Sequence, residues 1–466
     1  MTQIDIEIVS RPDPNAWGTE TRALLKLAGP LIITQLAQMA VMTTDVVMLG
    51  RLGKMEVAAA ALGNTVFFFA WLIGCGPAFA VSPMIAQIIG ARPTDRAGVR
   101  RVVRMGLWVT GILWLPLGIV LFFTEQILLL FGQSPILAHA AGIFVFPLVF
   151  GVFFSVAFQV LRNYMTALGK PNASLIVMAI TVLFNAGADY ALIFGHFGLP
   201  HLGLAGAGIA STLSFTFSFM AILTIALVAP STARYNILHH FQRPDWSKFA
   251  ELFRLGVPIG MTMMFEAMLF NTATLIMGTF GIAAVAAHQI ALNVASLTFM
   301  VPLGIAMAAT VRVGLMAGAG NRAGVKLAGS CAMLVAIVFM IASGILIAAF
   351  PQSLARLYFA DTPANADAIA LTAIFLRVAA AFQIFDGVQV VASLSLRGLK
   401  DARAPMWLAG VSYWLAGFPV CIALGYGLGM GGLGIWLGLA FALLVAAITL
   451  SARFYWLAGK ALLPTS

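Results

Sequence analysis

The sequence predicts an all-α integral membrane protein with twelve transmembrane helices in two six-helix bundles. Hydrophobic residues make up 61% of the 466 residues and charged residues only 9%, and the mean hydropathy is +1.00. A soluble globular protein carries roughly a quarter charged residues, so this chain could not cover its own surface in water. The composition excludes a soluble enzyme, a nucleic-acid-binding protein and a disordered tail.

Apolar stretches of transmembrane length follow one another along the chain. A helix that crosses the bilayer needs about 20 mostly apolar residues, and no alternation typical of β-barrel strands runs through the sequence. The polar N-terminal stretch lacks the features of a cleaved signal peptide, so we expect none. The predicted spans are residues 24–49, 57–82, 101–123, 139–162, 173–195, 205–229, 254–279, 284–310, 327–350, 366–394, 405–427 and 434–458.

The positions of Lys and Arg predict the orientation. If both termini share one side of the membrane, all but four of the 26 basic residues fall on that side. By the positive-inside rule, both termini are then cytoplasmic, and the net charge of +10 is a signal of topology rather than of a polyanion-binding patch. The four exceptions are Arg51, Lys54, Arg356 and Arg377.

An internal duplication divides the chain. Three segments recur half a chain later: Lys26-Leu-Ala-Gly-Pro30 as Arg254-Leu-Gly-Val-Pro258, the pair Gly50 and Gly53 as Gly278 and Gly281, and Arg96-Ala-Gly-Val-Arg100 as Arg322-Ala-Gly-Val-Lys326. We therefore predict a bundle over residues 1–229, a cytoplasmic linker over 230–253 and a second bundle over 254–466. Because each half has an even number of spans, a pseudo-twofold axis along the membrane normal should relate the halves, with a cavity between them.

Four acids lie inside the predicted spans, namely Asp45, Asp189, Glu266 and Asp386. A carboxylate near the bilayer centre costs several kcal/mol, so it usually faces a cavity and serves an ion or proton pathway. The alternative is a buried acid held by a hydrogen bond or by a basic partner. Arg377 is the only base that we place inside a span, and it lies near the span's end, so bases are too few to neutralise all four acids.

Helical spacing predicts the neighbours of these acids. Gln38 and Asp45 share a face of the first span, Asn185 and Asp189 are one turn apart, and Asp386 and Gln389 share a face of the tenth span. A sodium ion prefers several oxygen ligands, whereas a proton needs one carboxylate. Either ion could be served by these residues.

A substrate cavity is predicted at Gln38, Met42, Met264, His288, Gln289 and Gln389. Flexible thioethers and aromatic faces suit varied lipophilic cations, although the same residues also serve lipid contact, core packing and hydrogen bonds between helices. Cys75, Cys331 and Cys421 lie in apolar runs and are interpreted as packing residues. No phosphate-binding loop of the type GxxxxGK[ST] occurs, so no ATP site is evident and we expect no cofactor.

Several motifs together resemble one family, the multidrug and toxic compound extrusion (MATE) transporters, in their NorM-like bacterial branch. The resemblance covers essentially the whole chain and also includes the four acids. Its motifs are Thr43-Thr44-Asp45-Val-Val-Met-Leu-Gly50, Ala167-Leu-Gly-Lys-Pro-Asn172, Phe184-Asn185 with Asp189, Ala287-His288-Gln289-Ile290, and Leu396-Arg397-Gly398.

The resemblance implies a multi-pass antiporter of the bacterial inner membrane that exports cationic, amphipathic drugs or dyes in exchange for Na⁺ or H⁺. It associates Glu266 and Asp386 with cation binding, and Asp45, Asn185 and Asp189 with a second cation site. Phe382 stands one turn before Asp386, where sodium-coupled relatives are expected to have tyrosine, and this leaves protons open. The implied partners are small cationic drugs and membrane lipid, without nucleic acid, and we expect a monomer.

Three other functions compete with drug export. A flippase for lipid-linked saccharides, from the same superfamily, must hold a pyrophosphate and should need several bases in the spans that line its cavity. A membrane enzyme would need a catalytic constellation such as HExxH, and His288 is the only histidine well inside a predicted span. A passive channel is distinguished by testing whether transport runs uphill.

Overall fold

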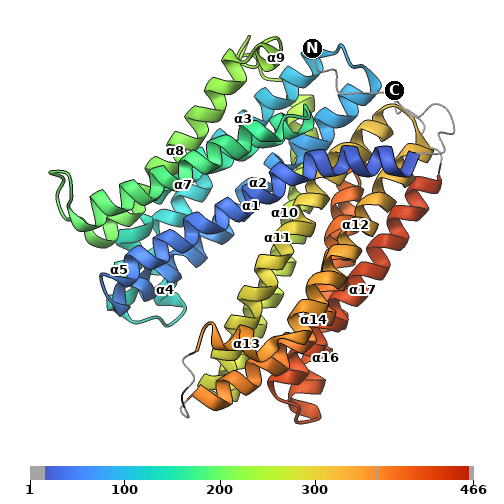
Figure 1. Cartoon of the computed structure of the whole chain (residues 1–466). Coiled ribbons are helices and arrows are strands. Elements are labelled where there is room, and N and C mark those ends of the chain that lie inside the picture. Colours follow the sequence, from blue (N-terminus) through green and yellow to red (C-terminus); the bar gives the residue numbers. More distant parts are fainter. Residues whose placement is uncertain (1–15, 360–361, 363–364, 461–466) are drawn as a thin grey trace. The chain divides into compact units, whose positions relative to one another are not determined.

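The computed structural model is built from long apolar helices (Figure 1). It describes residues 16–359, 362 and 365–460. In this part of the chain, twelve helices are long and apolar enough to cross a membrane, which confirms the predicted fold class and number of spans.

The helices of the first half of the chain begin with two long ones. They are α1 (Ala16–Gly50), α2 (Lys54–Ala91), α3 (Arg96–Phe122), α4 (Thr124–Leu130), α5 (Pro135–Val145), α6 (Leu148–Ala167), α7 (Pro171–Phe194), α8 (Gly203–Val228) and α9 (Pro230–Ala233).

The second half repeats the pattern of long helices. Its elements are α10 (Trp246–Met277), η1 (Gly278–Phe280), α11 (Ile282–Gly318), α12 (Arg322–Ala349), α13 (Pro351–Arg356), α14 (Ala366–Gly398), α15 (Arg403–Gly410), η3 (Val411–Gly417), α16 (Phe418–Ile422), η4 (Ala423–Gly427) and α17 (Gly432–Gly459).

Two predicted spans are less regular in the structure than a single α-helix. The predicted span 139–162 is divided between α5 and α6, and α6 continues to Ala167. Pro147 stands just before α6, where its missing N–H and fixed φ suit the start of a helix better than its interior. The span over 405–427 contains two π-helical segments, η3 and η4, which place one extra residue in the turn.

By their internal packing, the helices form two compact units. One unit comprises residues 33–260, here called the N-terminal unit, and the other comprises the described parts of 1–32 and 261–466, here called the C-terminal unit. The chain therefore changes unit within α1 and again within α10. The predicted division at residues 230–253 follows the sequence repeat instead, and the twofold relation of the halves stays a prediction.

In the N-terminal unit, α6 is the most enclosed helix and packs against α2, α3 and α8. The first part of α10 joins this unit through small residues. A Cβ atom on Gly76 of α2 would lie 2.5 Å from the Gly256 carbonyl oxygen, so these two backbones meet only because both residues are glycine.

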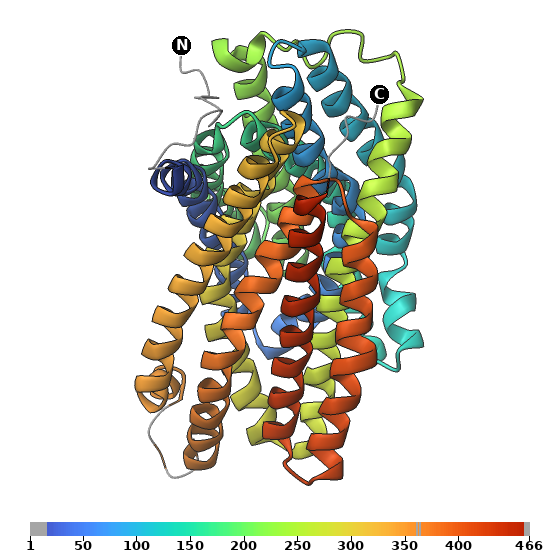
Figure 2. The same cartoon turned by 90° about the vertical axis from the view of Figure 1, so that its right-hand side faces the viewer.

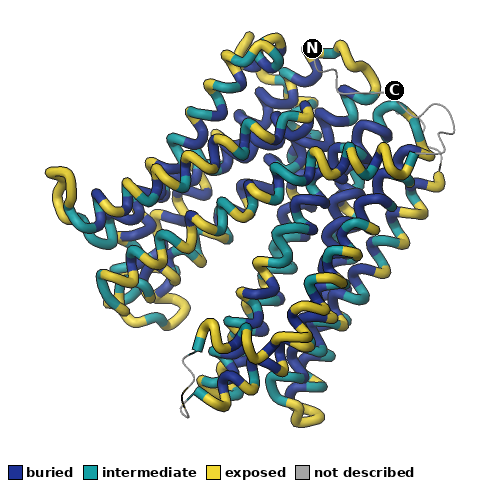
Figure 3. Tube along the Cα trace, in the orientation of Figure 1, coloured by how far each residue is buried: buried dark blue, intermediate teal, exposed yellow. Residues whose placement is uncertain are grey.

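In the C-terminal unit, α14 packs against α11, α12 and α17 (Figure 2). Its core includes Phe375, Phe382 and Trp436, all fully buried. The start of α1 joins this unit through Glu20, whose carboxylate accepts from Nε of Arg312 at 2.8 Å and also from Nη2. Figure 3 shows the buried and exposed positions that alternate along these helices.

Helix capping explains one of the sequence repeats. The Asp95 carboxylate accepts from the Gly98 N–H at 2.8 Å and starts α3, and Asn321 accepts from the Gly324 N–H at 2.8 Å and starts α12. Side-chain oxygens at this position satisfy N–H groups that have no partner inside the helix. The repeated Arg-Ala-Gly-Val segment is thus the first turn of a capped helix in each half. The three cysteines are free and buried, as expected for packing residues.

Candidate functional site

One candidate site in the N-terminal unit joins three of the predicted residues. Asp45 of α1 lies beside Asn185 and Asp189 of α7, close enough for direct hydrogen-bonding and electrostatic interaction. Ser211 of α8 donates to Oδ2 of Asp45 at 3.4 Å. Asn185 and Asp189 are completely buried, while Asp45 is half-buried. We call Asp45, Asn185, Asp189 and Ser211 the α7 cluster.

The oxygens of the α7 cluster are poorly satisfied. Oδ1 of Asp45, both carboxylate oxygens of Asp189 and both amide atoms of Asn185 are buried and have no well-formed hydrogen bond to any described residue. A buried polar group without a partner costs about 1–3 kcal/mol, and it is a recognised sign of an ion or water that completes the site. Three of these residues can therefore supply oxygens to one small cation, or a carboxylate to one proton.

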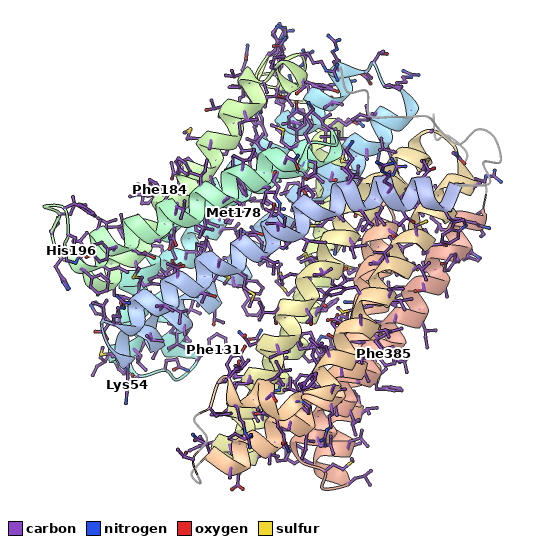
Figure 4. All side chains as sticks on the ribbon, in the orientation of Figure 1. Lys54, Phe131, Met178, Phe184, His196 and Phe385 are labelled. Carbon is purple, nitrogen blue, oxygen red and sulfur yellow. The ribbon has the colours of Figure 1, made fainter. Side chains whose placement is uncertain are left out.

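The two faces of α7 explain why these residues point inward. Thr181, one turn before Asn185, contacts Ser218 of α8 through its hydroxyl at 2.9 Å. Phe184, labelled in Figure 4, directly precedes Asn185 yet is 38% exposed and stacks on Phe217 at 4.8 Å between ring centroids. The polar side chains thus follow one face of α7 at helical spacing, and aromatic rings follow another.

A buried arginine lies in the same unit, near the C-terminal end of α6. Nη1 of Arg162 on α6 donates to Oε1 of Gln38 at 3.0 Å, and Nη2 donates to Oε1 of Gln35. Only 1% of Arg162 is exposed. Gln38, a predicted cavity residue, therefore holds a guanidinium and fixes α1 to α6, two turns before Asp45.

The prediction that Arg377 is the only base inside a span is wrong. Arg377 is exposed, whereas Arg162 and Arg397 are both buried within helices. The error came from the helix ends. Arg162 was the last residue of its predicted span and was counted with the following loop, but α6 continues to Ala167; α14 runs past the predicted end at residue 394 to Gly398 and so includes Arg397.

A second candidate site lies in the C-terminal unit and centres on Gln389. Its Nε2 donates to Oε1 of Glu266 on α10 at 3.0 Å and to Oδ1 of Asp386 at 3.2 Å. Its Oε1 accepts from the hydroxyl of Tyr413 on η3 at 3.1 Å. We call Glu266, Asp386, Gln389 and Tyr413 the Gln389 cluster.

The Gln389 cluster differs from the α7 cluster in its charge and in its bonding. The Arg397 guanidinium interacts electrostatically with Glu266 and supplies a positive charge that the α7 cluster does not receive from its own residues. Phe382, at the position where tyrosine was expected, packs against Trp436 at 5.5 Å and Phe270 at 6.1 Å between ring centroids. Tyr413 provides the hydroxyl from a different helix.

The remaining predicted cavity residues occupy unlike environments. Met42 is 61% exposed on α1, Met264 is half-buried and Gln289 is exposed. His288 is completely buried, forms a 3.0 Å hydrogen bond to Thr274 and packs on Trp436. This packing supports the interpretation of His288 as a hydrogen-bonding core residue and gives no support to its place in a cavity.

Ser211, Tyr413 and Arg162 were not identified from the sequence, and Arg397 was named only as part of a family motif. Ser211 carries no distinctive signal, because serine is common in apolar helices and only the neighbouring helix makes it a donor. Tyr413 is one of only seven tyrosines and lies inside a span, which was a usable signal. Arg397 could have been found by extending its predicted span by one turn, and Arg162 by counting the last residue of its predicted span as part of the helix.

Comparisons with known proteins agree with this architecture. The MatE family model matches residues 30–191 and 258–423. The chain is 42% identical over 450 residues to the "Probable multidrug resistance protein NorM" of Mesorhizobium japonicum, covering 96% of both chains. It is 37% identical over 444 residues to the protein of the same name from Pseudomonas aeruginosa, covering 95% of this chain and 91% of that one.

Solved structures show the same fold at low sequence identity. The crystal structure of the eukaryotic MATE transporter AtDTX14 matches with a TM-score of 0.83 at 22% identity, covering 96% of this chain and 99% of that one. A variant of the Vibrio cholerae MATE transporter VcmN matches with a TM-score of 0.86 at 19% identity, with the same coverage. With the family model and the full-length bacterial relatives, these findings show that the chain belongs to the MatE family, in its NorM-like bacterial branch.

Proposed function

We propose that this protein is a secondary active multidrug exporter that exchanges cationic, amphipathic drugs or dyes for Na⁺ or H⁺. The observation that carries the proposal is the α7 cluster, in which two carboxyls and an amide lie together in a transmembrane unit and several of their buried oxygens have no well-formed hydrogen bond to a described residue. Such a site attracts a cation or a proton, because either one restores the missing electrostatic interactions. The relatives named as multidrug resistance proteins support the choice of substrate class.

Antiport needs an ion and a drug that favour different states of the carrier. In our proposal, the α7 cluster binds the ion, and the ion's departure restores negative charge on Asp45 and Asp189. That charge then favours the binding of a cationic drug from the membrane or the cytoplasm. No cofactor takes part and no bond in the drug is made or broken, so the protein acts as a transporter and not as an enzyme.

The second acidic site gives the coupling ion an alternative. The Gln389 cluster holds Glu266 and Asp386 through one amide, and the Tyr413 hydroxyl adds a further oxygen nearby. The Tyr413 hydroxyl can take the place of the hydroxyl that Phe382 lacks. It therefore supports sodium binding in the C-terminal unit. Both sites therefore enter the proposal, and the choice between Na⁺ and H⁺ is left to experiment.

The flippase alternative receives no specific support from the geometry. Its substrate carries a pyrophosphate, and the buried guanidinium groups of Arg162 and Arg397 are candidates to bind it. Arg162 donates to Gln35 and Gln38, however, and Arg397 interacts with Glu266. Both guanidinium groups would have to give up these interactions to bind a phosphate.

The test is transport into or out of vesicles that contain the purified protein and ethidium. An imposed sodium gradient and an imposed proton gradient are applied separately, each with the other ion held equal on both sides. Uphill movement of ethidium under either gradient supports antiport and identifies the ion. Movement that only follows the dye's own gradient would indicate a channel and contradict the proposal.

We further propose that the protein resides in the bacterial inner membrane with both termini in the cytoplasm, and that it acts as a monomer. The distribution of Lys and Arg supports this orientation. Tags at residues 1 and 466 should both be protected from protease in right-side-out vesicles. Cleavage of only one tag would contradict the even number of spans.

A further inference from the structure

A dense group of basic residues lies where α2 ends, α3 begins and the segment before α10 packs on α3. Nη1 of Arg104 donates to the His240 carbonyl oxygen at 2.8 Å, and Nε1 of Trp108 donates to the Phe241 carbonyl oxygen at 2.9 Å. The Asp245 carboxylate lies 3.7 Å from Arg101. These contacts fix residues 240–245 against the first turns of α3. All of them lie within the N-terminal unit.

The charges in this group are far from balanced. Residues 92–104 contain five arginines and one acid, and residues 234–251 contain Arg234, Arg243 and Lys248 with two acids. Each of the three acids already has a local partner: Asp95 caps α3, Asp245 faces Arg101, and Glu251 binds Lys248 at 2.6 Å.

Four of the arginines reach the surface, and one of them, Arg234, also lies 5.3 Å from the centroid of the Tyr235 ring. Arg92, Arg96, Arg234 and Arg243 are all exposed, and none of them forms a salt bridge with any residue that the structure describes. The positive field also reaches the adjacent loop. There the pKa of His240 is lowered, first by neighbouring His239 and also by the surrounding arginines.

Large apolar side chains interrupt the same surface. Leu238 and Phe241 are exposed between the long helices, and Trp246 is exposed at the first residue of α10. Exposure of these apolar side chains to water is unfavourable. At a membrane interface, aromatic and aliphatic side chains enter the headgroup region and basic side chains reach the lipid phosphates. The basic and apolar residues therefore fit one kind of environment.

We propose that Arg92, Arg96, Arg234 and Arg243, together with Leu238, Phe241 and Trp246, form a binding surface for anionic phospholipid headgroups of the cytoplasmic leaflet. We call this set the interfacial basic surface. A free phosphate could pair with the arginines but would leave the three apolar side chains in water, so a lipid accounts for more of the surface. The proposal rests on the cytoplasmic orientation given above and not on drug export.

The interfacial basic surface is tested by titrating the purified full-length protein in detergent with phosphatidylglycerol or phosphatidylcholine, with bound lipid counted by native mass spectrometry. The test variant is Arg92→Gln/Arg96→Gln/Arg243→Gln. The matched control is Arg51→Gln/Lys54→Gln/Arg377→Gln, which removes three exposed charges elsewhere; Lys54 is labelled in Figure 4. All these side chains are exposed, so both variants should fold, as size-exclusion profiles and thermal unfolding will check.

We expect phosphatidylglycerol to bind the unmodified protein more tightly than phosphatidylcholine. The test variant should weaken this binding by about tenfold or more, because each basic side chain near an anionic surface attracts its headgroups. The control should change it less than about twofold, and excess inorganic phosphate should not displace the lipid. Equal binding of the two lipids, an unaffected test variant, or full displacement by phosphate would each overturn the proposal. None of these measurements requires transport, so they are independent of the proposed export function.

Discussion

Replacement of Gln389 by leucine tests whether the Gln389 cluster is held together by one amide. The substitution removes donors to Glu266 at 3.0 Å and Asp386 at 3.2 Å and an acceptor for Tyr413 at 3.1 Å. A hydrogen bond to a charged group contributes about 1.5–3 kcal/mol and a neutral one about 1 kcal/mol. The lower limits sum to about 4 kcal/mol. Because contacts in one network are not fully additive, we expect Gln389→Leu to lower the free energy of unfolding by about 3 kcal/mol.

The measurement is equilibrium unfolding in mixed micelles, with and without sodium. The matched control is Gln352→Leu, which removes an exposed amide from α13 in the same unit and should cost less than about 0.5 kcal/mol. If Glu266 and Asp386 bind sodium, the unmodified protein should gain stability with rising sodium concentration and Gln389→Leu should gain less. A loss below about 1 kcal/mol for Gln389→Leu would refute the view that this amide organises the cluster.

Three further substitutions test the N-terminal unit. Asp45→Asn should abolish ion-driven ethidium efflux while equilibrium dye binding persists, and undiminished efflux would remove this unit from the coupling mechanism. Gln38→Leu removes an acceptor from the buried Arg162 guanidinium and should lower the free energy of unfolding by about 1.5–3 kcal/mol in the same micelle assay; a loss within error would show that Gln35 alone suffices. Gly76→Leu should prevent correct folding, seen as aggregation in size-exclusion chromatography, because its Cβ would lie 2.5 Å from a carbonyl oxygen of α10. Gly111→Ala, with open space around it, should leave the profile unchanged.

Substrate charge gives a prediction for the whole transporter. An acidic site in a medium of low dielectric constant attracts lipophilic cations more than anions of the same size. Cells that express the protein should therefore resist ethidium-like dyes and cationic fluoroquinolones, and an Asp45→Asn strain serves as the control. Equal protection against anionic drugs would contradict the reasoning from charge.

Much of the fold could be predicted from the sequence because the bilayer imposes a simple rule. A spanning helix must be apolar over a fixed length, so composition along the chain reveals the twelve long helices found in the described residues. Helix ends are less constrained, since a polar residue can lie one turn inside the helix if a neighbour binds it. Arg162 and Arg397 are such residues: Arg162 was the last residue of its predicted span and was counted with the following loop, and Arg397 was placed just outside its span.

The candidate sites were predicted in part, for a related physical reason. Spacing on one helix shows which residues share a face, and it correctly paired Asn185 with Asp189 and Asp386 with Gln389. It does not show which helix packs opposite that face. Ser211 enters its cluster from a neighbouring helix, and Tyr413 enters from a π-helical segment, whose altered register a simple count of residues does not anticipate.

The two acidic clusters differ in a way that favours one of them for ion exchange. Gln389 cross-links Glu266, Asp386 and Tyr413, so the hydrogen-bonding capacity of the C-terminal cluster is partly used within the protein. In the α7 cluster, by contrast, Asp189 has two buried oxygens without a well-formed bond to any described residue. An ion that arrives there can bind these two oxygens directly, and after its departure they can bind a second cation. The α7 cluster is therefore where we expect ion and drug to compete most directly.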